Sequence, residues 1–311
     1  MTTLFKAQRP VVVIGGAIGD IVLNLDQLPR SGGDTLAVET GRQVGGCGFN
    51  VARALRRLEV EVINGMTVGN GPWGEQIAAQ MQALTLPVLL RDLNQDNGWC
   101  LALVEPNGER TFVTVTGCET QWHTTALDSL PLDAQAIVYA NGYELVGDAG
   151  ATLRQWLLDL PRQQCCFLDF GPRIVDLPSA FISALAGSNT TLSLNRQETA
   201  LLCGEGEPVA QAQALAQRLQ LNVLCRLDHE GAWCCQPGQP PQPVPAYPVQ
   251  LVDTVGAGDA HCAGVLAGLA AGWSLMAAAD LGNRVAACVV EQTGAAGAPD
   301  WDHLRRRFYP G

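Results

Sequence analysis

Short apolar runs alternate with helical segments along most of the chain, and this alternation restricts the possible folds more than any other feature. The runs that we expect to form strands are residues 11–15, 60–64, 88–91, 136–140, 165–169, 191–194 and 223–227. The segments that we expect to form helices are residues 50–57, 73–84, 149–160, 196–203, 208–219 and 257–271. The alternation predicts an α/β fold with a doubly wound, mostly parallel sheet flanked by helices.

Two segments interrupt the alternation. Residues 21–45 alternate polar and apolar side chains and contain turn residues, including Pro29 and Gly32, where a helix would be expected. Residues 99–117 have the pattern of a hairpin with its turn at Pro106-Asn107-Gly108. We expect both segments to leave the main sheet and to form a small β flap from two sequence-distant pieces. The whole chain, 1–311, is expected to form a single α/β domain that includes this flap.

Composition excludes several classes of protein. With 47% hydrophobic and 16% charged residues, the chain is too apolar to remain disordered. Its 30 acidic residues against 19 basic ones, a net charge of −11, argue against a nucleic-acid partner. The uncharged stretch between Asp259 and Asp280 is long enough to span a bilayer, but Gly272 interrupts it. We expect two buried helices there and no membrane partner.

The cysteines indicate a reducing compartment. The chain has 11 of them, and none falls in a Cys-x-x-Cys pair that would suggest a metal site or redox centre. No secretory signal is visible before the apolar run at 11–14. We therefore expect buried free thiols in a cytoplasmic protein.

The motif with the clearest chemistry is Asp-Thr-Val-Gly-Ala-Gly-Asp at residues 253–259, followed by a helical pattern. Gly256, Ala257 and Gly258 would leave backbone N–H groups accessible at a helix N-terminus, which attracts anions. Asp259 lies at the same helix start, where the dipole favours its ionised form. A carboxylate beside an anion hole can accept a proton from an alcohol that attacks phosphorus. A capped strand–helix turn would explain a bare Gly-x-Gly-Asp, but the full pattern favours catalysis.

This motif resembles the C-terminal signature of the ribokinase-like carbohydrate kinases, the PfkB family. Residues 45–52, Gly-Gly-Cys-Gly-Phe-Asn-Val-Ala, resemble the family's N-terminal signature, and residues 195–198, Asn-Arg-Gln-Glu, are similar to its Asn-x-x-Glu motif. The three motifs occur in the family's order and approximate spacing. The resemblance covers essentially the whole chain and implies a ribokinase-like fold with a β-sheet lid formed by about 21–45 and 99–117. It also implies ATP-dependent phosphorylation of a hydroxymethyl group of a sugar.

The resemblance assigns roles to individual residues. Asp259 matches the catalytic base, and Gly256, Ala257 and Gly258 match the anion hole. The residues that match sugar contacts are Asp20, Gly45, Gly46 and Asn50. Those expected to bind the nucleotide are Asn195, Glu198, Arg226, Asp228, Gly231 and Asn283, with Asn195 and Glu198 organising Mg²⁺ through water and Asn283 in the adenine pocket. Those that fall where relatives bind a monovalent cation are Asp253, Val255 and Gly294. The implied cofactors are ATP and Mg²⁺, with K⁺ as the monovalent ion.

Four residues depart from the family's pattern. Ile18 stands where ribokinases carry an Asn that touches sugar, and Cys47 replaces a Lys common in ribose kinases. Arg226 and Asp228 stand where a Thr or Lys and a Gly are usual. The substrate is therefore left open among ribose-like sugars, nucleosides, ketoses and sugar acids, and no motif favours a sugar phosphate. The alternatives are a nucleoside kinase of the same family and a non-catalytic sugar sensor.

Other interpretations have weaker support. Residues 11–20 superficially resemble a dinucleotide fingerprint, but the Gly-x-Gly-x-x-Gly spacing fails, and no P-loop motif is present. His261 lies near Asp259 in sequence, and a packing role is the simpler interpretation. Arg110, in the expected hairpin, is interpreted as a solvated charge with a possible reach toward substrate. An exposed edge of the flap would favour a homodimer formed through the lid.

Overall fold

The computed structural model describes residues 5–309. The strands are β1 Val11–Ile14, β2 Ile18–Leu25, β3 Ala37–Gly45, β4 Val62–Asn64, β5 Thr67–Val68, β6 Leu90–Arg91, β7 Trp99–Val104, β8 Arg110–Val115, β9 Ile137–Asn141, β10 Cys165–Asp169, β11 Thr190–Asn195, β12 Asn222–Arg226, β13 Ala232–Cys235 and β14 Gln242–Val244. The α-helices are α1 Cys47–Arg57, α2 Pro72–Ala83, α3 Thr124–Asp128, α4 Ala151–Asp159, α5 Ser179–Ala184, α6 Arg196–Cys203, α7 Pro208–Leu219, α8 Ala257–Ala270, α9 Leu275–Val289 and α10 Trp301–Phe308. Short 3₁₀ segments lie at Cys118–Thr120, Gly142–Glu144, Gly171–Asp176 and Asp228–Glu230.

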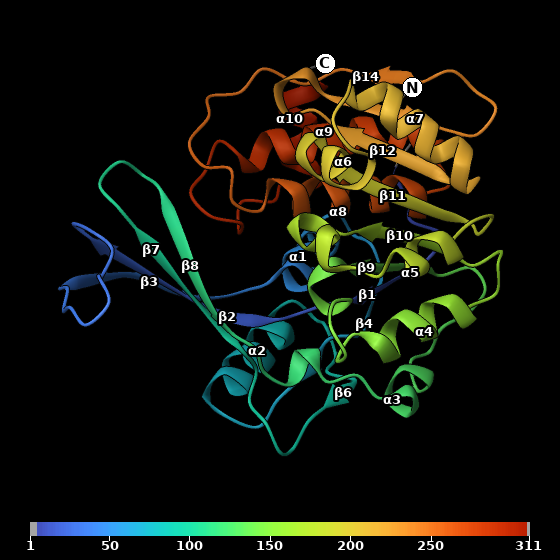
Figure 1. Cartoon of the computed structure of the whole chain (residues 1–311). Helices are drawn as coiled ribbons and strands as arrows, with labels where there is room; N and C mark the ends of the chain where they lie inside the picture. Colours follow the sequence, from blue (N-terminus) through green and yellow to red (C-terminus); the bar gives the residue numbers. More distant parts are fainter. Residues whose placement is uncertain (1–4, 310–311) are drawn as a thin grey trace.

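The main sheet has the strand order β14-β13-β12-β11-β10-β9-β1-β4 (Figure 1). The strands from β4 to β12 pair in parallel, and β13 and β14 add an antiparallel edge. The chain passes from β1 to β4 on one side and later to β9 on the other, so the direction of winding changes at β1. This confirms the predicted doubly wound, mostly parallel sheet, whose ligands are expected at the carboxyl ends of its strands.

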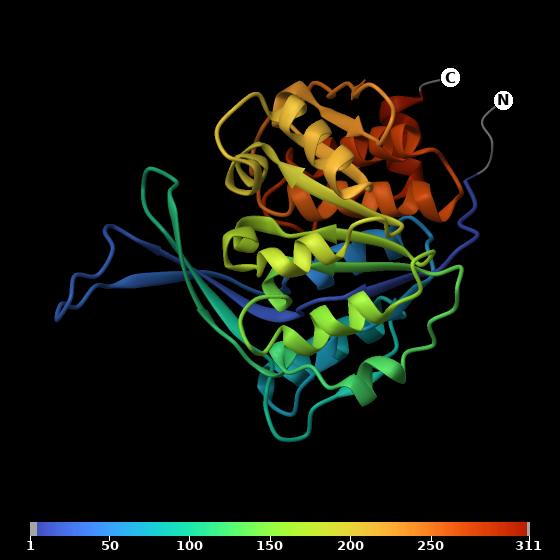
Figure 2. The same ribbon diagram turned by 45° about the vertical axis from the view of Figure 1, so that its right-hand side comes forward.

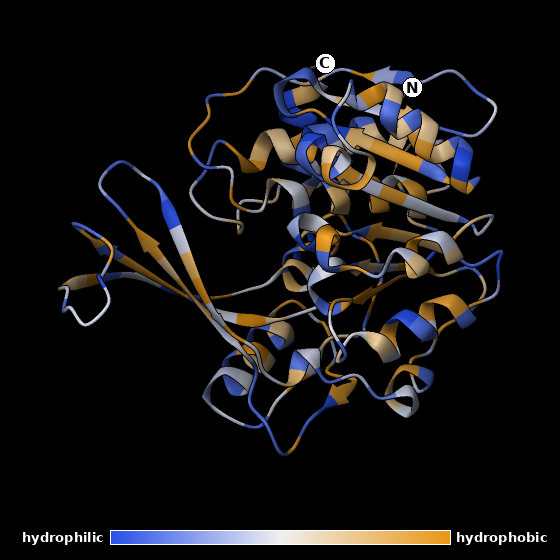
Figure 3. Ribbon diagram, viewed as in Figure 1, coloured by the Kyte–Doolittle hydropathy of each residue, from blue (hydrophilic) through white to orange (hydrophobic). Residues whose placement is uncertain are grey.

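Two apolar layers cover the sheet, because successive side chains of a strand point to opposite faces. Val11 and Val13 pack in one cluster with α1, α8 and α9. Val12 and Ile14 pack in the other with α4, α5 and α7. All four β1 side chains are fully buried, which explains the continuous apolar runs of the sequence (Figure 3).

The uncharged stretch forms most of α8 and the start of α9, and most residues of these two helices are buried, as predicted. Their small residues allow a close approach: a Cβ built on Gly264 would lie 2.7 Å from the Cα of Gly282. The Ala- and Gly-rich composition therefore serves helix packing. Within residues 5–309, no helix has the length and apolarity that a membrane span requires.

A second, four-stranded sheet has the order β3-β2-β7-β8, and we call it the flap sheet. β2 pairs with β3 and β7 with β8 in antiparallel fashion, while β2 and β7 run in parallel and join the two pieces. Figure 2 shows this sheet extending away from the main domain. The small separate sheet built from sequence-distant pieces is confirmed, although it begins at Ile18, three residues before the expected start.

Other details differ from the sequence-based expectation. The run at 88–91 is not a strand of the main sheet, because β6 pairs only with β5 in a two-stranded sheet. The Pro-rich segment 236–248, where no strand is expected from the sequence, contains β14, which forms one edge of the main sheet. The 11 cysteines are all free thiols, as expected, and most are buried.

Candidate active site

Polar side chains gather at the carboxyl ends of the parallel strands. Asp169 ends β10, Asn195 ends β11 and Arg226 ends β12. Asn195 and Arg226 lie opposite each other in the β11–β12 register. This is the edge of an open α/β sheet at which ligands bind, and the start of α8 faces the same group of residues.

The start of α8 depends on Gly256. This residue caps the helix in a left-handed conformation with φ +77°, which L side chains rarely adopt. A Cβ built there would also lie 2.4 Å from the Cβ of Ala295. The first helical hydrogen bond runs from the N–H of Ala260 to the carbonyl of Gly256 (2.9 Å). Contrary to the expectation for Ala257, its N–H donates to the carbonyl of Thr254 (3.2 Å), whereas the N–H groups of Gly258 and Asp259 remain available to an anion.

Asp259 is linked to the N-terminal motif across 209 residues of sequence. The Nδ2 of Asn50 donates to Asp259 Oδ2 over 2.8 Å. The Nη2 of Arg53 donates to Asn50 Oδ1, also over 2.8 Å, which fixes the orientation of the Asn50 amide. The structure thus joins a predicted sugar contact to the predicted base.

The ionisation of Asp259 differs from the expectation based on the helix dipole. Burial raises the pKa of Asp259 to about 6, against the hydrogen bonds from Asn50 and Cys47, which lower it. Desolvation of the carboxylate outweighs the favourable helix end. At pH 7 the group is still mostly ionised, so it can act as a base.

The other predicted sugar contacts lie close to one another. A Cβ built on Gly45 would lie 1.9 Å from Asp20 Oδ2, so only glycine lets this carboxylate approach. Gly46 caps α1 with φ +93°. Burial raises the pKa of Asp20 to about 6, and the charge of Arg53 partly opposes this.

Asn195 and Glu198 form a capping box at the start of α6. Glu198 N–H donates to Asn195 Oδ1 (2.8 Å), and Glu198 Oε2 accepts from the Asn195 N–H (2.7 Å). Asn195 Nδ2 also donates to Glu198 Oε1 over 2.8 Å. Arg226 joins this pair to Asp169 through its Nη2, which donates to Glu198 Oε2 (3.2 Å) and Asp169 Oδ1 (3.3 Å).

Three further residues predicted to bind the nucleotide have clear local roles. Asp228 has φ +52° and an exposed side chain, which explains why glycine would suit this turn equally well. Gly231 has φ +91°, and a Cβ there would lie 2.3 Å from the carbonyl oxygen of Val244. Asn283 Nδ2 donates to the carbonyls of Val244 (3.2 Å) and Pro245 (2.9 Å) and so ties α9 to the end of β14.

The structure also brings the predicted cation-site residues together. Asp253 Oδ1 accepts from the Val255 N–H (3.0 Å), and Oδ2 accepts from the Gly294 N–H (2.9 Å). Arg110 from the flap sheet donates to both oxygens over 3.1 Å. Burial raises the pKa of Asp253, but these hydrogen bonds lower it more, and its pKa lies below the usual value. Arg110 is therefore an ion-pair partner of the motif and not a solvated strand charge.

Several residues of the site carry no sequence motif that marks them. Arg53 and Asp169 are the clearest cases. For Asp169 the sequence gives one indication of a role in the site, because this residue ends a segment that we expect to form a strand. Glu144 is buried near Gly16, and burial raises its pKa to about 8, which favours the protonated form at pH 7. His261 is buried between α8 and α9, and burial lowers its pKa to about 3, in agreement with a packing role.

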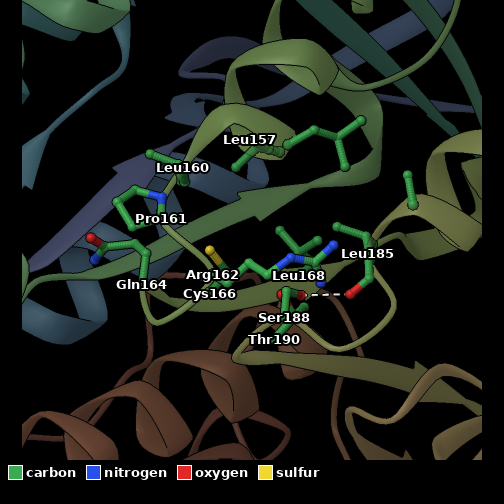
Figure 4. A pocket seen from close by; sticks show the side chains of 12 residues that line it. Leu157, Leu160, Pro161, Arg162, Gln164, Cys166, Leu168, Leu185, Ser188 and Thr190 are labelled. Carbon is green, nitrogen blue, oxygen red and sulfur yellow. Dashed lines mark hydrogen bonds between the residues drawn. The ribbon is translucent and has the colours of Figure 1, made fainter.

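A small pocket elsewhere does not belong to this group. Figure 4 shows it lined by residues of α4, of the connection that follows α4 and of neighbouring strands, with a short hydrogen bond from Ser188 to the carbonyl of Leu185 (2.7 Å). Gln164 precedes β10, and Thr190 begins β11. These positions lie at the amino ends of the strands, opposite the edge that carries Asp169 and Arg226.

Comparison with known proteins identifies the family of the chain. The family model described as pfkB family carbohydrate kinase matches residues 8–302. The chain belongs to the pfkB family of carbohydrate kinases. It is 40% identical to the uncharacterized sugar kinase YegV of Escherichia coli (strain K12), over 96% of this chain and 93% of that protein. It is 27% identical to the 1-phosphofructokinase of the same strain, over 83% of each chain.

Solved structures share the pfkB fold over nearly the full length. The ribokinase of Arabidopsis thaliana, solved with ribose and ATP, superposes with a TM-score of 0.83 at 21% identity and covers 97% of this chain and 99% of its own. A ribokinase of Thermotoga maritima has a TM-score of 0.80 at 19% identity, over 96% and 98% of the two chains. The fold is therefore ribokinase-like, and the chain is a sugar kinase of the pfkB family.

Proposed function

We propose that this pfkB-family kinase transfers the γ-phosphoryl group of ATP to a hydroxymethyl group of a sugar, with Asp259 as general base and residues 256–258 as the anion hole. The observation that carries the proposal is the hydrogen bond between Asn50 and Asp259 at the N-terminus of α8. It places a predicted sugar contact beside a carboxylate and within reach of free N–H groups. An attacking hydroxyl, its base and N–H donors to the phosphoryl oxygens thus fit in one place.

The proposed reaction is an in-line displacement. Asp20 and Asn50 hold the sugar so that its hydroxyl points at Asp259. The hydroxyl oxygen forms a bond to the γ-phosphorus, the bond to the β-phosphate oxygen breaks, and the hydroxyl proton passes to Asp259 Oδ. The N–H groups at the start of α8 stabilise the charge on the transferring phosphoryl oxygens. ADP leaves with the electron pair of the broken bond.

The residues at the nucleotide end fit Mg²⁺ held through water. Glu198 Oε1 has a single donor, Asn195 Nδ2, and retains a lone pair for a metal-bound water. Within residues 5–309, no cluster of three or more ligating side chains could hold a metal directly, and Mg²⁺ in kinases relies largely on phosphate and water oxygens. When bound, Mg²⁺ would neutralise phosphate charge, and Glu198 would orient its water.

The proposed monovalent site is more restricted. Each carboxylate oxygen of Asp253 already accepts two hydrogen bonds, one from Arg110 and one from a backbone N–H. A K⁺ ion at Asp253, Val255 and Gly294 would therefore have to rely on backbone oxygens. The proposed nucleotide site also includes Asp228 and Gly231, in the turn between β12 and β13, and Asn283 on α9.

The flap sheet is the proposed lid. Arg110 already joins it to the loop before α8, so that the sheet can cover a sugar held by Asp20 and Asn50. Closure would exclude water, which could otherwise accept the phosphoryl group in place of the sugar. The free thiols support the further proposal that the enzyme acts in the cytoplasm.

Asp259→Asn tests the assignment of the base. We expect the variant to bind ATP and sugar almost as the wild type does, but to lose about 10²–10⁴-fold in kcat, the usual contribution of base catalysis. The assay is coupled ADP release with a panel of pentoses, hexoses, ketoses, sugar acids and nucleosides. Asp302→Asn, at an exposed ion pair on α10, is the matched control and should keep full activity.

The same panel separates the alternatives. If the enzyme phosphorylates a nucleoside but no free sugar, its substrate is a nucleoside and the proposed sugar acceptor is wrong. Binding of a sugar without ADP release from the wild type would identify a non-catalytic sensor. If Asp259→Asn retained more than about a tenth of the wild-type kcat, the assignment of Asp259 as base would be wrong.

A further inference from the structure

The guanidinium group of Arg226 lies between two carboxylates and the start of α8. Its Nη2 is used by Asp169 and Glu198, at 3.3 and 3.2 Å. In the part of the chain that the structure describes, its Nη1 has no hydrogen-bond acceptor, and a Cβ built on Gly258 would lie 2.8 Å from this nitrogen. One edge of the guanidinium thus holds carboxylates, while the other edge faces the proposed anion hole.

The charge of Arg226 opposes an otherwise acidic environment. Asp169, Glu198 and Asp259 all lie around the phosphate end of the site, where carboxylates would repel an incoming phosphate. The Arg226 side chain is only 13% exposed, so its charge is weakly screened by water. In a chain with a net charge of −11, this arginine supplies a local positive charge where an anion is expected.

The orientation of Arg226 is fixed before any ligand arrives. A guanidinium is planar, so the two hydrogen bonds of Nη2 also set the direction of Nη1. Gly258 has no side chain and leaves room for this edge, whereas any larger residue would displace it. Donors held in place in this way stabilise developing charge without reorganisation during the reaction.

We propose that Arg226 is a further catalytic residue, whose Nη1 donates a hydrogen bond to a non-bridging oxygen of the phosphoryl group during transfer. This inference rests on the proposed kinase reaction and adds to it. Arg226 exchanges no proton and forms no covalent bond. It neutralises part of the negative charge as the bond to the sugar oxygen forms and the bond to ADP breaks, while Asp259 takes the proton.

A purely structural arginine would behave differently. If Arg226 only paired with Asp169 and Glu198, its replacement would change stability but would not distinguish one nucleotide from another. A residue that touches the terminal phosphoryl group must affect the binding of a triphosphate more than that of ADP. The comparison of the two ligands therefore separates the roles.

The test uses Arg226→Lys in the full-length protein with Mg²⁺ present. Lysine keeps the positive charge for the carboxylates, but a single ammonium group cannot serve them and the phosphoryl group at once. The affinities are measured by titration calorimetry, and we expect the variant to bind ADP about as tightly as the wild type does. Its affinity for the β,γ-imido analogue of ATP should fall about tenfold or more, because a charge-assisted hydrogen bond is lost. With a sugar substrate, kcat should fall by about 10²–10³-fold with little change in the sugar KM.

Two further variants make the outcome decisive. Arg226→Met combined with Asp169→Asn removes the cation together with one carboxylate, so the buried net charge is unchanged. This double variant provides the test if Arg226→Lys folds poorly. It should show the same selective loss of the triphosphate analogue. Arg218→Met, at an exposed position on α7, is the control and should bind both nucleotides normally. Thermal unfolding of each variant reports its folding.

Equal affinities of the folded variants and the wild type for the analogue would overturn the inference and leave Arg226 a structural residue. Equal losses for ADP and the analogue would also overturn it, because they would show a general effect on the nucleotide site. A wild type that binds no ATP, or transfers no phosphoryl group to any acceptor, would instead contradict the proposed function. The two failures are therefore distinguishable.

Discussion

Asp259 shows how a single side chain responds to competing effects. Its place at a helix N-terminus favours the carboxylate, and Asn50 donates to it over 2.8 Å. Burial acts in the opposite direction and is the larger effect, so the pKa rises to about 6. Sequence alone identifies the helix end, but the extent of desolvation depends on side chains that only the fold brings together.

The raised pKa of Asp259 predicts an acid limb in the pH profile. A base must be ionised, so kcat/KM should be at its plateau well above pH 6, reach half of that value at about pH 6 and continue to fall as the pH decreases further. Asn50→Ala removes a hydrogen bond that lowers this pKa and should move the limb to higher pH. The measurement is kcat/KM against pH with the sugar that the panel identifies. A wild-type limb near pH 4, or no shift in the variant, would contradict this account.

At the same scale, the sequence predicts some neighbours of Asp259 and not others. Gly45, Gly46 and Asn50 come from the N-terminal motif, and the structure places Asn50 beside the base and Gly45 beside Asp20. Arg53 and Asp169 belong to no motif, because their importance arises from contacts with residues far away in sequence. Arg226 is visible only as a departure from the family pattern, and its contacts with Asp169 and Glu198 are apparent only from the folded structure.

At the scale of elements, periodicity predicts the main sheet well. The expected strand at residues 165–169 and helices at 196–203 and 208–219 match β10, α6 and α7 residue for residue. A strand buried on both faces and a helix buried on one face each have a characteristic apolar pattern, and this pattern lies within the segment itself. The pairing of β5 with β6, and of β2 with β7, depends on distant segments and is not encoded in any local pattern.

The contact between Arg110 and Asp253 leads to a prediction about the flap sheet. Arg110 lies at the start of β8, and its ion pair with the largely buried Asp253 joins the hairpin to the loop before α8. Arg110→Ala should release the hairpin, and amides of β7 and β8 should exchange hydrogen several-fold faster. Arg305→Ala, which removes an exposed ion pair on α10, is the control. Unchanged exchange in Arg110→Ala would show that strand pairing alone holds the hairpin in place.

At the scale of the whole molecule, the low charge content has a physical explanation. A sheet covered by helices on both faces buries most of its strand residues, and α8 and α9 pack against each other through small apolar residues. The net charge of −11 gives no general attraction for ATP. Nucleotide binding therefore depends on local donors, namely the helix end at 256–258, Arg226 and Mg²⁺.

The flap sheet leaves an apolar edge strand exposed, and this predicts self-association. Every residue of β8 is exposed, including Phe112 (58%) and Val113 (48%), and β8 is an edge strand. An unpaired edge with apolar side chains can add a strand from a second copy. We predict a homodimer through the flap sheets and expect Phe112→Glu to be monomeric in sedimentation at micromolar concentration.

Val175→Glu provides the matched control, because Val175 is equally exposed (59%) but lies outside the flap sheet. It should leave the dimer intact. If the wild type itself sediments as a monomer, the flap edge does not join two copies. The apolar side chains of β8 would then be best explained by closure over the sugar, since that movement would bury them within one chain.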